Sequence, residues 1–457
     1  MKVRRMYVTM KKTGENKMSD ITIDFSKKLG PIKPMHCVNN GPVIAGKEQI
    51  RSNFSTYKEL NIPYSRNHDA ALCSNYGGEH IVDIHAVFPD FDKDVNDPKS
   101  YDFFLTDRYI KNTMEAGSEI FYRLGTKIEH APKQYGAIVP KDFKKWAQIC
   151  EHIIMHYNEG WANGYKWNIT YWEIWNEPDG APNWSGTMDE YHELYKITAI
   201  HLKKRFPKIK IGGPAMTYGI NVAQVNFFEY LKNSEEDIPM DFYSWHDYTI
   251  SPKEIAKTAN VVRERLDKAG YTKTESILNE WNYVENWTTK WIDSLKVITG
   301  LKGAAFIAAC MCEGQNSAAD MLMYYDARIN SAMNGMFDFY TLAPLKGYYP
   351  FKIFSELYIR QNQVEAKSLD DDVYIVAAKA DSGVHKGKGV VMLCYYDEND
   401  TGKEKKLTFS AKGAMNDAFK VFIVDEKRDL FNIDLWDFSK GEIEITLKPN
   451  DIIMLMQ

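Results

Sequence analysis

Short apolar runs alternate with longer amphipathic segments along most of this chain. Eight runs have the length and composition of strands, and they cover residues 34–40, 62–69, 118–125, 169–177, 208–216, 240–248, 274–283 and 321–327. Helical patterns lie between them, as in 191–202, where apolar residues recur at intervals of three and four. We expect Asp189 to cap this helix and a further helix near 101–116. The alternation therefore predicts successive strand–helix units.

Eight strand–helix units in succession predict a parallel sheet, and eight is the number that closes a (β/α)8 barrel. An open doubly wound sheet is the rival fold. However, no Gly-x-Gly-x-x-Gly motif follows the first run, so the usual nucleotide-binding signature is missing. Residues 70–117 are too long for a simple connection, and we expect them to decorate the rim of the barrel. The prediction is an α/β fold with a TIM barrel over residues 34–361.

After residue 361 the pattern changes to short β-rich segments separated by turns, such as GKGVVMLCYYDEND and GEIEITLKPNDIIMLMQ. This texture predicts an accessory antiparallel β-sandwich domain over residues 362–457. The early stretch 20–33 has the pattern of one more strand, and we expect it to join the sandwich. Residues 1–19 are predicted to form an N-terminal tail.

Composition and charge limit the kinds of molecule that this protein is expected to bind and the compartments in which it is expected to work. The chain is 44% hydrophobic and 26% charged, with a net charge of −5, so we expect no nucleic-acid partner, which would need a basic surface. No apolar run is long enough to span a membrane, and the basic N-terminal stretch lacks the apolar core of a secretory signal. We expect a cytoplasmic location if this start is authentic, and a periplasmic or secreted one if a signal peptide was removed. Homo-oligomerisation is left open.

Two acidic residues stand at the ends of predicted strands. Glu177 follows the apolar run YWEIW, Glu280 ends the run ILNEWNY, and an asparagine precedes each of them. In a TIM barrel the C-terminal ends of the strands carry the active site. The fourth and seventh strands open on the same mouth, so we expect the two carboxylates to face each other across it.

A facing pair of carboxylates is what glycoside hydrolysis requires, because one acid protonates the leaving oxygen while the other attacks or guides water. Glu177 stands near Trp172 and Trp175, and apolar surroundings raise the pKa of a carboxyl group, which suits a general acid. We expect Glu280 to stay ionised if Arg66 or a tyrosine hydroxyl donates to it.

The motifs WNEP at 175–178 and NEW at 279–281 resemble those of the retaining glycosidases of clan A. With YSRNHD, KIGGPA, SWHDY and YYDA on other strands, residues 20–457 look more narrowly like glycoside hydrolase family 39, which contains β-xylosidases and α-L-iduronidases. The resemblance implies a double displacement with Glu177 as acid/base and Glu280 as nucleophile. Water is the second substrate, and neither a cofactor nor a metal is implied.

The same resemblance implies a set of substrate-binding residues. Asn176 would hydrogen-bond the sugar 2-hydroxyl, and His246 and Tyr248 would line the subsite of the reacting sugar. Trp281 is a candidate stacking platform, as are Trp184 and Trp287. The remaining candidates are Arg66 and His68 on the second strand, His36 at the end of the first strand, and Asp326 at the end of the eighth.

The sequence leaves the sugar open. α-L-Iduronidases carry a lysine two residues after the strand-six histidine, where this chain has Tyr248, so an acidic sugar would lack its cation. The default prediction is a retaining, exo-acting hydrolase of a terminal β-xyloside in polysaccharide degradation. β-Galactoside, β-glucoside, α-L-arabinoside and α-L-iduronide are alternative substrates. The alternative from another class is a non-catalytic carbohydrate-binding barrel, which would need one of the two acids to be lost or blocked.

Overall fold

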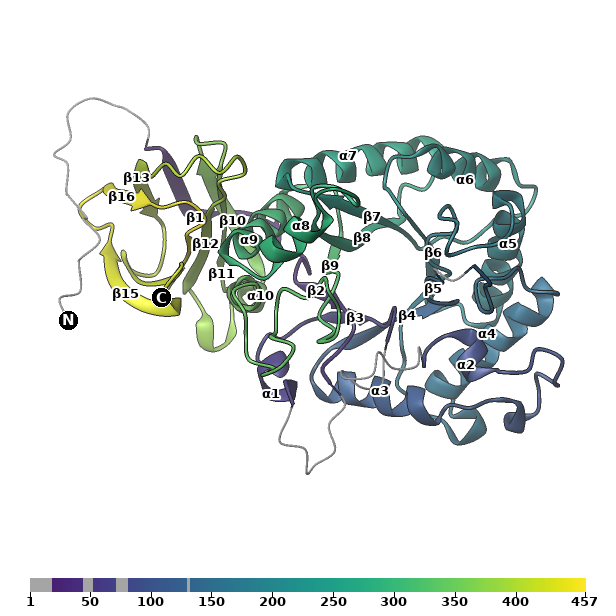
Figure 1. The fold of residues 1–457 in the computed structure, drawn as a ribbon. Coiled ribbons are helices and arrows are strands. Elements are labelled where there is room, and N and C mark those ends of the chain that lie inside the picture. Colours follow the sequence, from purple (N-terminus) through teal and green to yellow (C-terminus); the bar gives the residue numbers. More distant parts are fainter. Residues whose placement is uncertain (1–18, 44–51, 71–80, 130–131) are drawn as a thin grey trace.

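The computed structural model describes residues 19–43, 52–70, 81–129 and 132–457. These residues form a closed parallel barrel and a separate nine-stranded sheet (Figure 1). The predicted fold class, a TIM barrel with an accessory antiparallel β-domain, is thereby confirmed. The expected N-terminal tail lies, except for residue 19, outside the described residues.

Eight strands close the barrel in chain order, from β2 to β9 and back to β2. They are β2 (Cys37–Asn39), β3 (Tyr64–Arg66), β4 (Glu119–Leu124), β5 (Tyr171–Ile174), β6 (Lys210–Met216), β7 (Phe242–Thr249), β8 (Glu275–Tyr283) and β9 (Met321–Tyr324). Each strand falls inside one of the eight predicted runs or extends one residue beyond it. All neighbouring pairs are parallel, so the C-terminal ends of all eight strands meet at one mouth.

Helices surround the barrel, as Figure 1 shows. They are α1 (Phe54–Lys58), α2 (Ile84–Val87), α3 (Phe104–Glu115), α4 (Phe143–Asn158), α5 (Met188–Arg205), α6 (Val222–Asn233), α7 (Pro252–Ala269), α8 (Trp291–Ile298), α9 (Leu301–Asn316) and α10 (Tyr348–Arg360), with short 3-10 turns at Pro98–Ser100, Trp161–Asn163 and Gly383–His385. The predicted cap of α5 is wrong. Thr187 caps the helix through a capping box with Glu190, and Asp189 lies inside the first turn.

The barrel interior changes from apolar to polar along its axis. Toward the N-terminal ends of the strands, one buried cluster fills it with Cys37, Phe121, Tyr171, Phe242, Ile277, Met321 and Met323. Nearer the mouth the buried side chains are charged or polar, and they include Arg66, Glu173 and Ser244. The barrel is therefore a packed core, and the fully buried charged side chains of Arg66 and Glu173 lie nearer its C-terminal end.

The second domain is one hydrogen-bonded sheet in the order β15-β14-β17-β12-β11-β10-β1-β13-β16. Its strands are β1 (Ile21–Pro31), β10 (Asn362–Ser368), β11 (Val373–Lys379), β12 (Gly389–Tyr395), β13 (Lys405–Lys412), β14 (Ala418–Val424), β15 (Asp429–Asp437), β16 (Ile443–Leu447) and β17 (Ile452–Met456). All pairs are antiparallel except β1 with β13. The sheet curls around its own apolar core, to which all nine strands contribute (Figure 1). The domain limits expected from the sequence stay a proposal.

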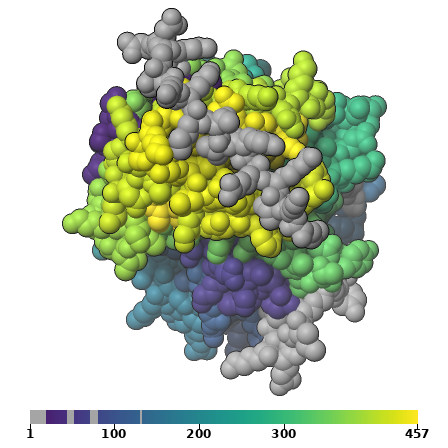
Figure 2. All heavy atoms as spheres, turned by 90° about the vertical axis from the view of Figure 1, so that its left-hand side faces the viewer, coloured from purple at the N-terminus to yellow at the C-terminus, as the bar shows by residue number. Residues whose placement is uncertain are grey.

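The outer face of this sheet packs on the barrel. Helices α9 and α10 contact β11 and β12, and the main apolar core continues from the barrel helices into Met392, Cys394 and Met454. The hydroxyl of Tyr396 donates to the carbonyl oxygen of Ile250 at 2.7 Å. Figure 2, turned toward this domain, shows the C-terminal residues in yellow gathered into one body against the rest of the molecule. The shared core ties the two domains together.

Among the described residues, no single helix has the length and apolar character needed to cross a bilayer. Helices α8 and α9 pass that test only as a pair, and they are bent by 81° at the break between them. Most of α9 is buried in the protein core.

Candidate active site

Glu177 lies just beyond β5, on a turn that leaves the strand at Ile174. Trp175 and Glu177 both adopt positive φ angles, +74° and +46°, which are uncommon for residues other than glycine. The Trp175 ring packs on Trp146, and its Nε1 donates to the carbonyl oxygen of Asn183 at 2.8 Å. Strained backbone of this kind clusters at functional sites. Here it allows Glu177 to turn into the barrel mouth while Trp175 stays in the core.

Glu280 is aimed by a bulge in β8. The register pairs Trp245 with Leu278 but His246 with Glu280, so Asn279 is one extra residue on β8. Asn279 then reaches the barrel interior, where its Nδ2 donates to Glu173 at 2.5 Å, and Glu280 reaches it as well. A bulge re-aims side chains that simple alternation would send to opposite faces.

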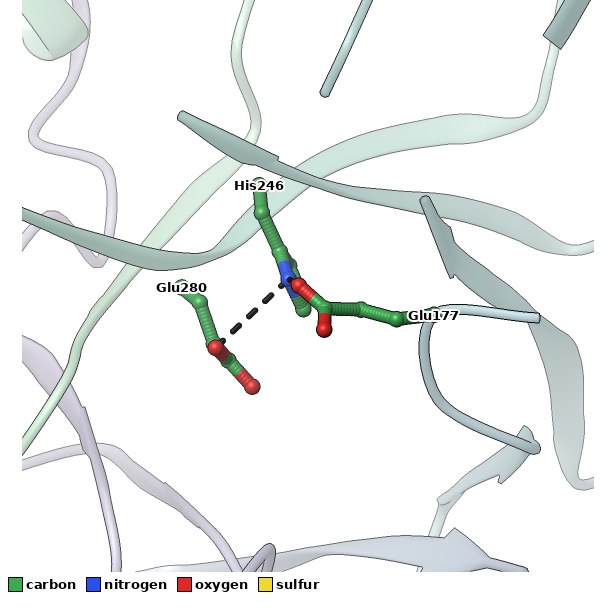
Figure 3. Close-up of side chains that lie close together, drawn as sticks. All are labelled: Glu177, His246 and Glu280. Atoms are coloured by element: carbon green, nitrogen blue, oxygen red, sulfur yellow. Dashed lines mark hydrogen bonds and ion pairs between the residues drawn. The ribbon is translucent and has the colours of Figure 1, made fainter. Parts of the chain in front are cut away.

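The two acids converge on His246 (Figure 3). Nδ1 of His246 lies 2.7 Å from Oε1 of Glu177 and 3.5 Å from Oε2 of Glu280. One side-chain atom from each of the three residues lies within 4.8 Å of the others. Two carboxylates that stand 103 residues apart in the sequence therefore share one small space at the mouth.

Glu280 is surrounded by donors. Nη1 of Arg66 donates to its Oε1 at 2.7 Å, and the hydroxyl of Tyr248 donates to its Oε2 at 2.8 Å. Burial raises the pKa of Glu280, while His246 and Arg66 oppose that rise. Both hydrogen bonds favour the charged form of the carboxylate and fix its orientation. The sequence offered Arg66 or a tyrosine hydroxyl as the donor, and both are in place.

Glu177 has the opposite character. Burial raises its pKa to about 8, and the nearby charge of Asp179 adds to the rise. Nδ2 of Asn183 donates to its Oε2 at 3.0 Å, and Asp179 itself is held by Thr217 and Asn221. A carboxyl group with this pKa holds its proton at neutral pH and can act as a general acid.

His246 stays neutral at the centre of the site. Burial lowers its pKa to about 4, and its side chain is fully buried. With Glu177 and Glu280 it forms the one group within the described ranges whose spacing resembles a metal site. Two ligands at the usual 2.0–2.1 Å around a tetrahedral zinc ion would stand about 3.3 Å apart. The 2.7 Å contact between His246 and Glu177 is instead the length of a hydrogen bond, so these residues fit a metal ion poorly.

Arg66 links the acids to a buried polar layer beneath them. It is fully buried, its Nε donates to Glu173 at 2.7 Å and its Nη2 donates to Asn176 at 2.6 Å. Glu173 also accepts from the hydroxyl of Ser244 at 2.6 Å. Sequence reasoning missed Glu173, although an acid inside the apolar run YWEIW was the available signal, because a buried carboxylate needs partners.

His68 follows the end of β3 by two residues, contacts the same layer and has a defined proton position. Nε of Arg123 donates to its Nδ1 at 3.2 Å, and because arginine only donates, the ring proton must lie on Nε2. That nitrogen lies 3.6 Å from Oε1 of Glu280 and 3.8 Å from Asp69. Arg123 is anchored in turn by Asp83 at 2.5 Å. Neither Arg123 nor Asp83 was predicted.

Seven of the predicted site residues thus form one connected group, namely Glu177, Glu280, Asn176, His246, Tyr248, Arg66 and His68. The placement of His36 contradicts the prediction. It precedes β2 and lies at the opposite end of the barrel, where its Nε2 contacts the carbonyl oxygen of Asn61 and its ring packs on Phe354 and Tyr358. The predicted run begins at residue 34, but β2 begins only at Cys37, so His36 stands ahead of the strand and not at its C-terminal end.

Trp281 also departs from the prediction. It is completely buried and packs on Phe306 and Tyr324, because the bulge that turns Glu280 inward turns the next residue outward. Trp184 is buried as well, at 3% exposure. Trp287 is 57% exposed and contacts Tyr248, so of these three candidate platforms it alone offers an open ring.

Asp326 follows β9 at the C-terminal end of the barrel, as predicted, but its carboxylate is already bound by other groups of the protein. It accepts hydrogen bonds from Nδ2 of Asn40 at 3.2 Å and from the backbone nitrogen of Arg328 at 2.5 Å, and it forms an ion pair with the Arg328 guanidinium at 3.2 Å. These contacts and its full burial give Asp326 a role in holding the loop after β9.

Comparisons with known proteins give relatives of this chain in sequence and in structure. The family model for glycosyl hydrolases family 39 matches residues 21–429. A beta-xylosidase of Caldicellulosiruptor saccharolyticus is 29% identical over 273 residues, which are 55% of this chain and 50% of that protein. A beta-xylosidase of Geobacillus stearothermophilus is 33% identical over 113 residues, which are 24% of this chain and 21% of that protein. The matches thus span half or less of the length of these relatives.

Solved structures share the fold over nearly the whole chain. A glucosidase from Croceicoccus marinus has a TM-score of 0.77 at 19% identity, covering 97% of this chain and 99% of that one. A monomeric beta-xylosidase from Caulobacter crescentus CB15 has a TM-score of 0.68 at 15% identity, covering 95% and 98%. At these low identities the comparison shows a shared fold, namely a barrel with its accessory sheet.

Proposed function

The chain belongs to glycosyl hydrolases family 39, and from this premise we propose that it is a retaining, exo-acting glycoside hydrolase. Glu177 is the acid/base and Glu280 the nucleophile. The observation that carries the proposal is the convergence of the two carboxylates on His246, with oxygen atoms within 4.8 Å. Retaining enzymes hold their carboxyl groups about 5–5.5 Å apart, whereas inverting enzymes need about 6.5–9.5 Å to admit a water molecule.

The first step transfers the sugar to the enzyme. Glu177, which keeps its proton at neutral pH, gives that proton to the glycosidic oxygen, and the C1–O bond to the leaving group breaks. An oxygen of Glu280 bonds to C1, so the carboxylate becomes an ester. Arg66 and Tyr248 keep the attacking group ionised and oriented until the bond forms.

The second step returns both acids to their starting states. Once Glu280 is a neutral ester, its charge no longer opposes the ionisation of Glu177, so the pKa of Glu177 falls. Glu177 can then take a proton from water while the water oxygen bonds to C1 and displaces Glu280. Glu177 thus ends the cycle protonated and Glu280 ionised.

Asn176 is proposed to bind the sugar 2-hydroxyl. Its Oδ1 accepts from Arg66, which fixes the amide orientation, and its Nδ2 has no hydrogen-bond partner among the residues that the structure describes. That free donor suits a hydroxyl contact that strengthens as charge develops on the ring. His246 and Tyr248 are proposed to line the same subsite, with His68 and Arg66 supporting the Glu280 side.

A terminal β-xyloside is the default substrate, because both relatives named above are beta-xylosidases. β-Galactoside, β-glucoside and α-L-arabinoside fit the same mechanism. An α-L-iduronide is less favoured, because Tyr248 donates to Glu280 at the position where a cation would be needed. The presence of both acids weighs against a barrel that only binds sugar.

A panel of p-nitrophenyl glycosides tests the proposal. The wild type should hydrolyse one terminal sugar with net retention, read by NMR of the anomer first released. Glu280→Gln should lose at least about 10⁴-fold in kcat/KM, and Glu177→Gln should lose about 10²–10⁴-fold on poor leaving groups. Glu285→Gln, an exposed glutamate on the loop after β8, is the matched control and should keep wild-type rates. Wild-type rates in both active-site variants would refute the assignment.

A further inference from the structure

An exposed apolar patch lies on the loop and helix that follow β8. Trp287 is 57% exposed and Ile292 is 61% exposed. The ring of Trp287 stacks on that of Trp291, with centroids 5.0 Å apart and planes 28° from parallel. We call Trp287 and Trp291 the tryptophan shelf. Isolated apolar side chains are ordinary on protein surfaces. Here, however, two tryptophan rings are in contact, and the exposed Ile292 follows Trp291 directly in the sequence.

The tryptophan shelf adjoins the nucleophile through one side chain. The ring of Tyr248 meets Trp287 edge to face, at 4.9 Å between centroids and 75° between planes. The hydroxyl of the same tyrosine donates to Oε2 of Glu280 at 2.8 Å. A sugar reacting at Glu280 therefore lies one ring away from Trp287.

The loop that carries Trp287 is held in shape by its own side chains. Oδ1 of Asn286 accepts from the backbone nitrogens of Thr288 and Lys290, both at 3.0 Å, and from the hydroxyl of Thr288 at 3.2 Å. The backbone nitrogen of Glu285 donates to the hydroxyl of Ser294 at 3.0 Å. The exposed ring is thus presented by an ordered turn, which lowers the entropy lost when a ligand stacks on it.

The surroundings suit a ligand that has one flat apolar face and hydroxyl groups at its edge. Thr288, Thr289 and Lys290 are exposed next to the ring and provide hydroxyl and ammonium donors. A pyranose ring has this character, because its C–H groups form an apolar face and its hydroxyls point outward from the edge. Tryptophan combines a large apolar face with a polar edge and suits such surfaces.

We propose that Trp287, supported by Trp291, is the stacking platform for the sugar residue joined to the one that is released. This inference rests on the proposed function, in which an exo-acting enzyme removes the terminal sugar. Tyr248 already occupies the space between Trp287 and Glu280, so the shelf meets the neighbouring residue rather than the reacting one. Short oligosaccharides are therefore the preferred substrates over glycosides with a small leaving group.

The test compares a substrate with a second sugar against one without. With xylose as the terminal sugar, the two probes are xylobiose and β-D-xylosyl fluoride, and any other sugar found in the glycoside panel replaces xylose in both. In Trp287→Ala, the ratio of kcat/KM on xylobiose to that on the fluoride should fall at least about tenfold, mainly through KM. Trp287→Phe should restore part of the ratio. Phe431→Ala, which removes a 64% exposed aromatic ring from the distant β15, should leave it unchanged.

An unchanged ratio in Trp287→Ala would overturn the platform while leaving the hydrolase intact. If the wild type hydrolyses neither probe, quenching of tryptophan fluorescence by xylotriose tests the stacking platform separately from the hydrolase function. Quenching that disappears in Trp287→Ala would keep the platform and reject the proposed function. Absence of both turnover and quenching would reject both.

Discussion

Nη1 of Arg66 lies 2.7 Å from Oε1 of Glu280, and Nε of the same guanidinium lies 2.7 Å from Oε2 of Glu173. One buried cation thus compensates two buried carboxylates and also orients Asn176. The hydrogen bonds to Glu173 and Asn176 hold the Arg66 guanidinium in position beside Glu280. Packing, charge balance and chemistry at the mouth depend on this single side chain.

Arg66→Met should therefore destabilise the fold as well as abolish activity. Removing one partner of a buried ion pair leaves the other charge uncompensated, and the expected loss in the free energy of unfolding is about 3–5 kcal/mol. Arg205→Met breaks the half-exposed ion pair with Glu159 and should change the free energy of unfolding by less than about 1 kcal/mol. Urea denaturation of both variants makes the comparison. Equal losses would show that the buried network is not what stabilises the barrel mouth.

The pH dependence of kcat/KM should report Glu177. Its folded-state pKa of about 8 lies above the ordinary 4.5, so the proton needed for catalysis is present at neutral pH and lost as pH rises through about 8. Activity on poor leaving groups should fall above that pH, and Glu177→Gln should lack this limb. The same shift means that stability contributed by neutral Glu177 is complete below about 4.5 and lost as pH rises toward 8. A basic limb that persists in Glu177→Gln would assign it to another group.

Asp179→Asn should move that limb to lower pH. The charge of Asp179 contributes to the raised pKa of Glu177, and an amide removes the charge. The amide oxygen can still accept from the backbone nitrogen of Thr217 and the amide nitrogen can donate to the Thr217 hydroxyl, whereas the hydrogen bond from Asn221 is lost. Glu229→Gln, on the exposed surface of α6, is the control. The prediction fails if the limb of Asp179→Asn coincides with that of the wild type or moves to higher pH.

Tyr248→Phe isolates the hydroxyl that donates to Glu280. The ring contact with Trp287 is kept, so the expected loss is about 10–100-fold in kcat, with little change in thermal stability. Tyr191→Phe removes a comparable buried hydroxyl that does not contact the acid pair. This hydroxyl donates to the carbonyl oxygen of Ile174 at 3.0 Å. Its effect should be on stability, by about 1 kcal/mol, and not on kcat. Matching kinetic effects in the two variants would argue against a direct role for Tyr248.

The barrel and its facing acids were predictable because both depend on simple periodicities. Strand runs separated by amphipathic helices specify eight parallel strands, and parallel strands bring their C-terminal ends together. Glu177 lies just beyond the fourth barrel strand and Glu280 lies in the C-terminal half of the seventh, so topology alone puts them at one mouth. No detailed side-chain geometry was needed for that step.

The remaining details depend on local backbone geometry that no periodicity encodes. One extra residue in β8 sends Trp281 outward, and β2 begins only after His36, which leaves His36 at the N-terminal end of the barrel. The hydroxyl of Thr187 reaches the backbone nitrogen of Glu190 and outcompetes Asp189 as the helix cap. Glu173 was missed because its partners come from β3, β7 and β8, far away in the sequence.

The central claim is that Glu280 forms a covalent bond to the sugar, and trapping that bond tests it most directly. A 2,4-dinitrophenyl 2-deoxy-2-fluoro-β-D-xyloside should inactivate the enzyme and add one fluorosugar to the intact mass. Peptide mapping should place the label on Glu280, with Glu177 unmodified. A label on any other residue, or turnover with inversion and no labelling, would contradict the account.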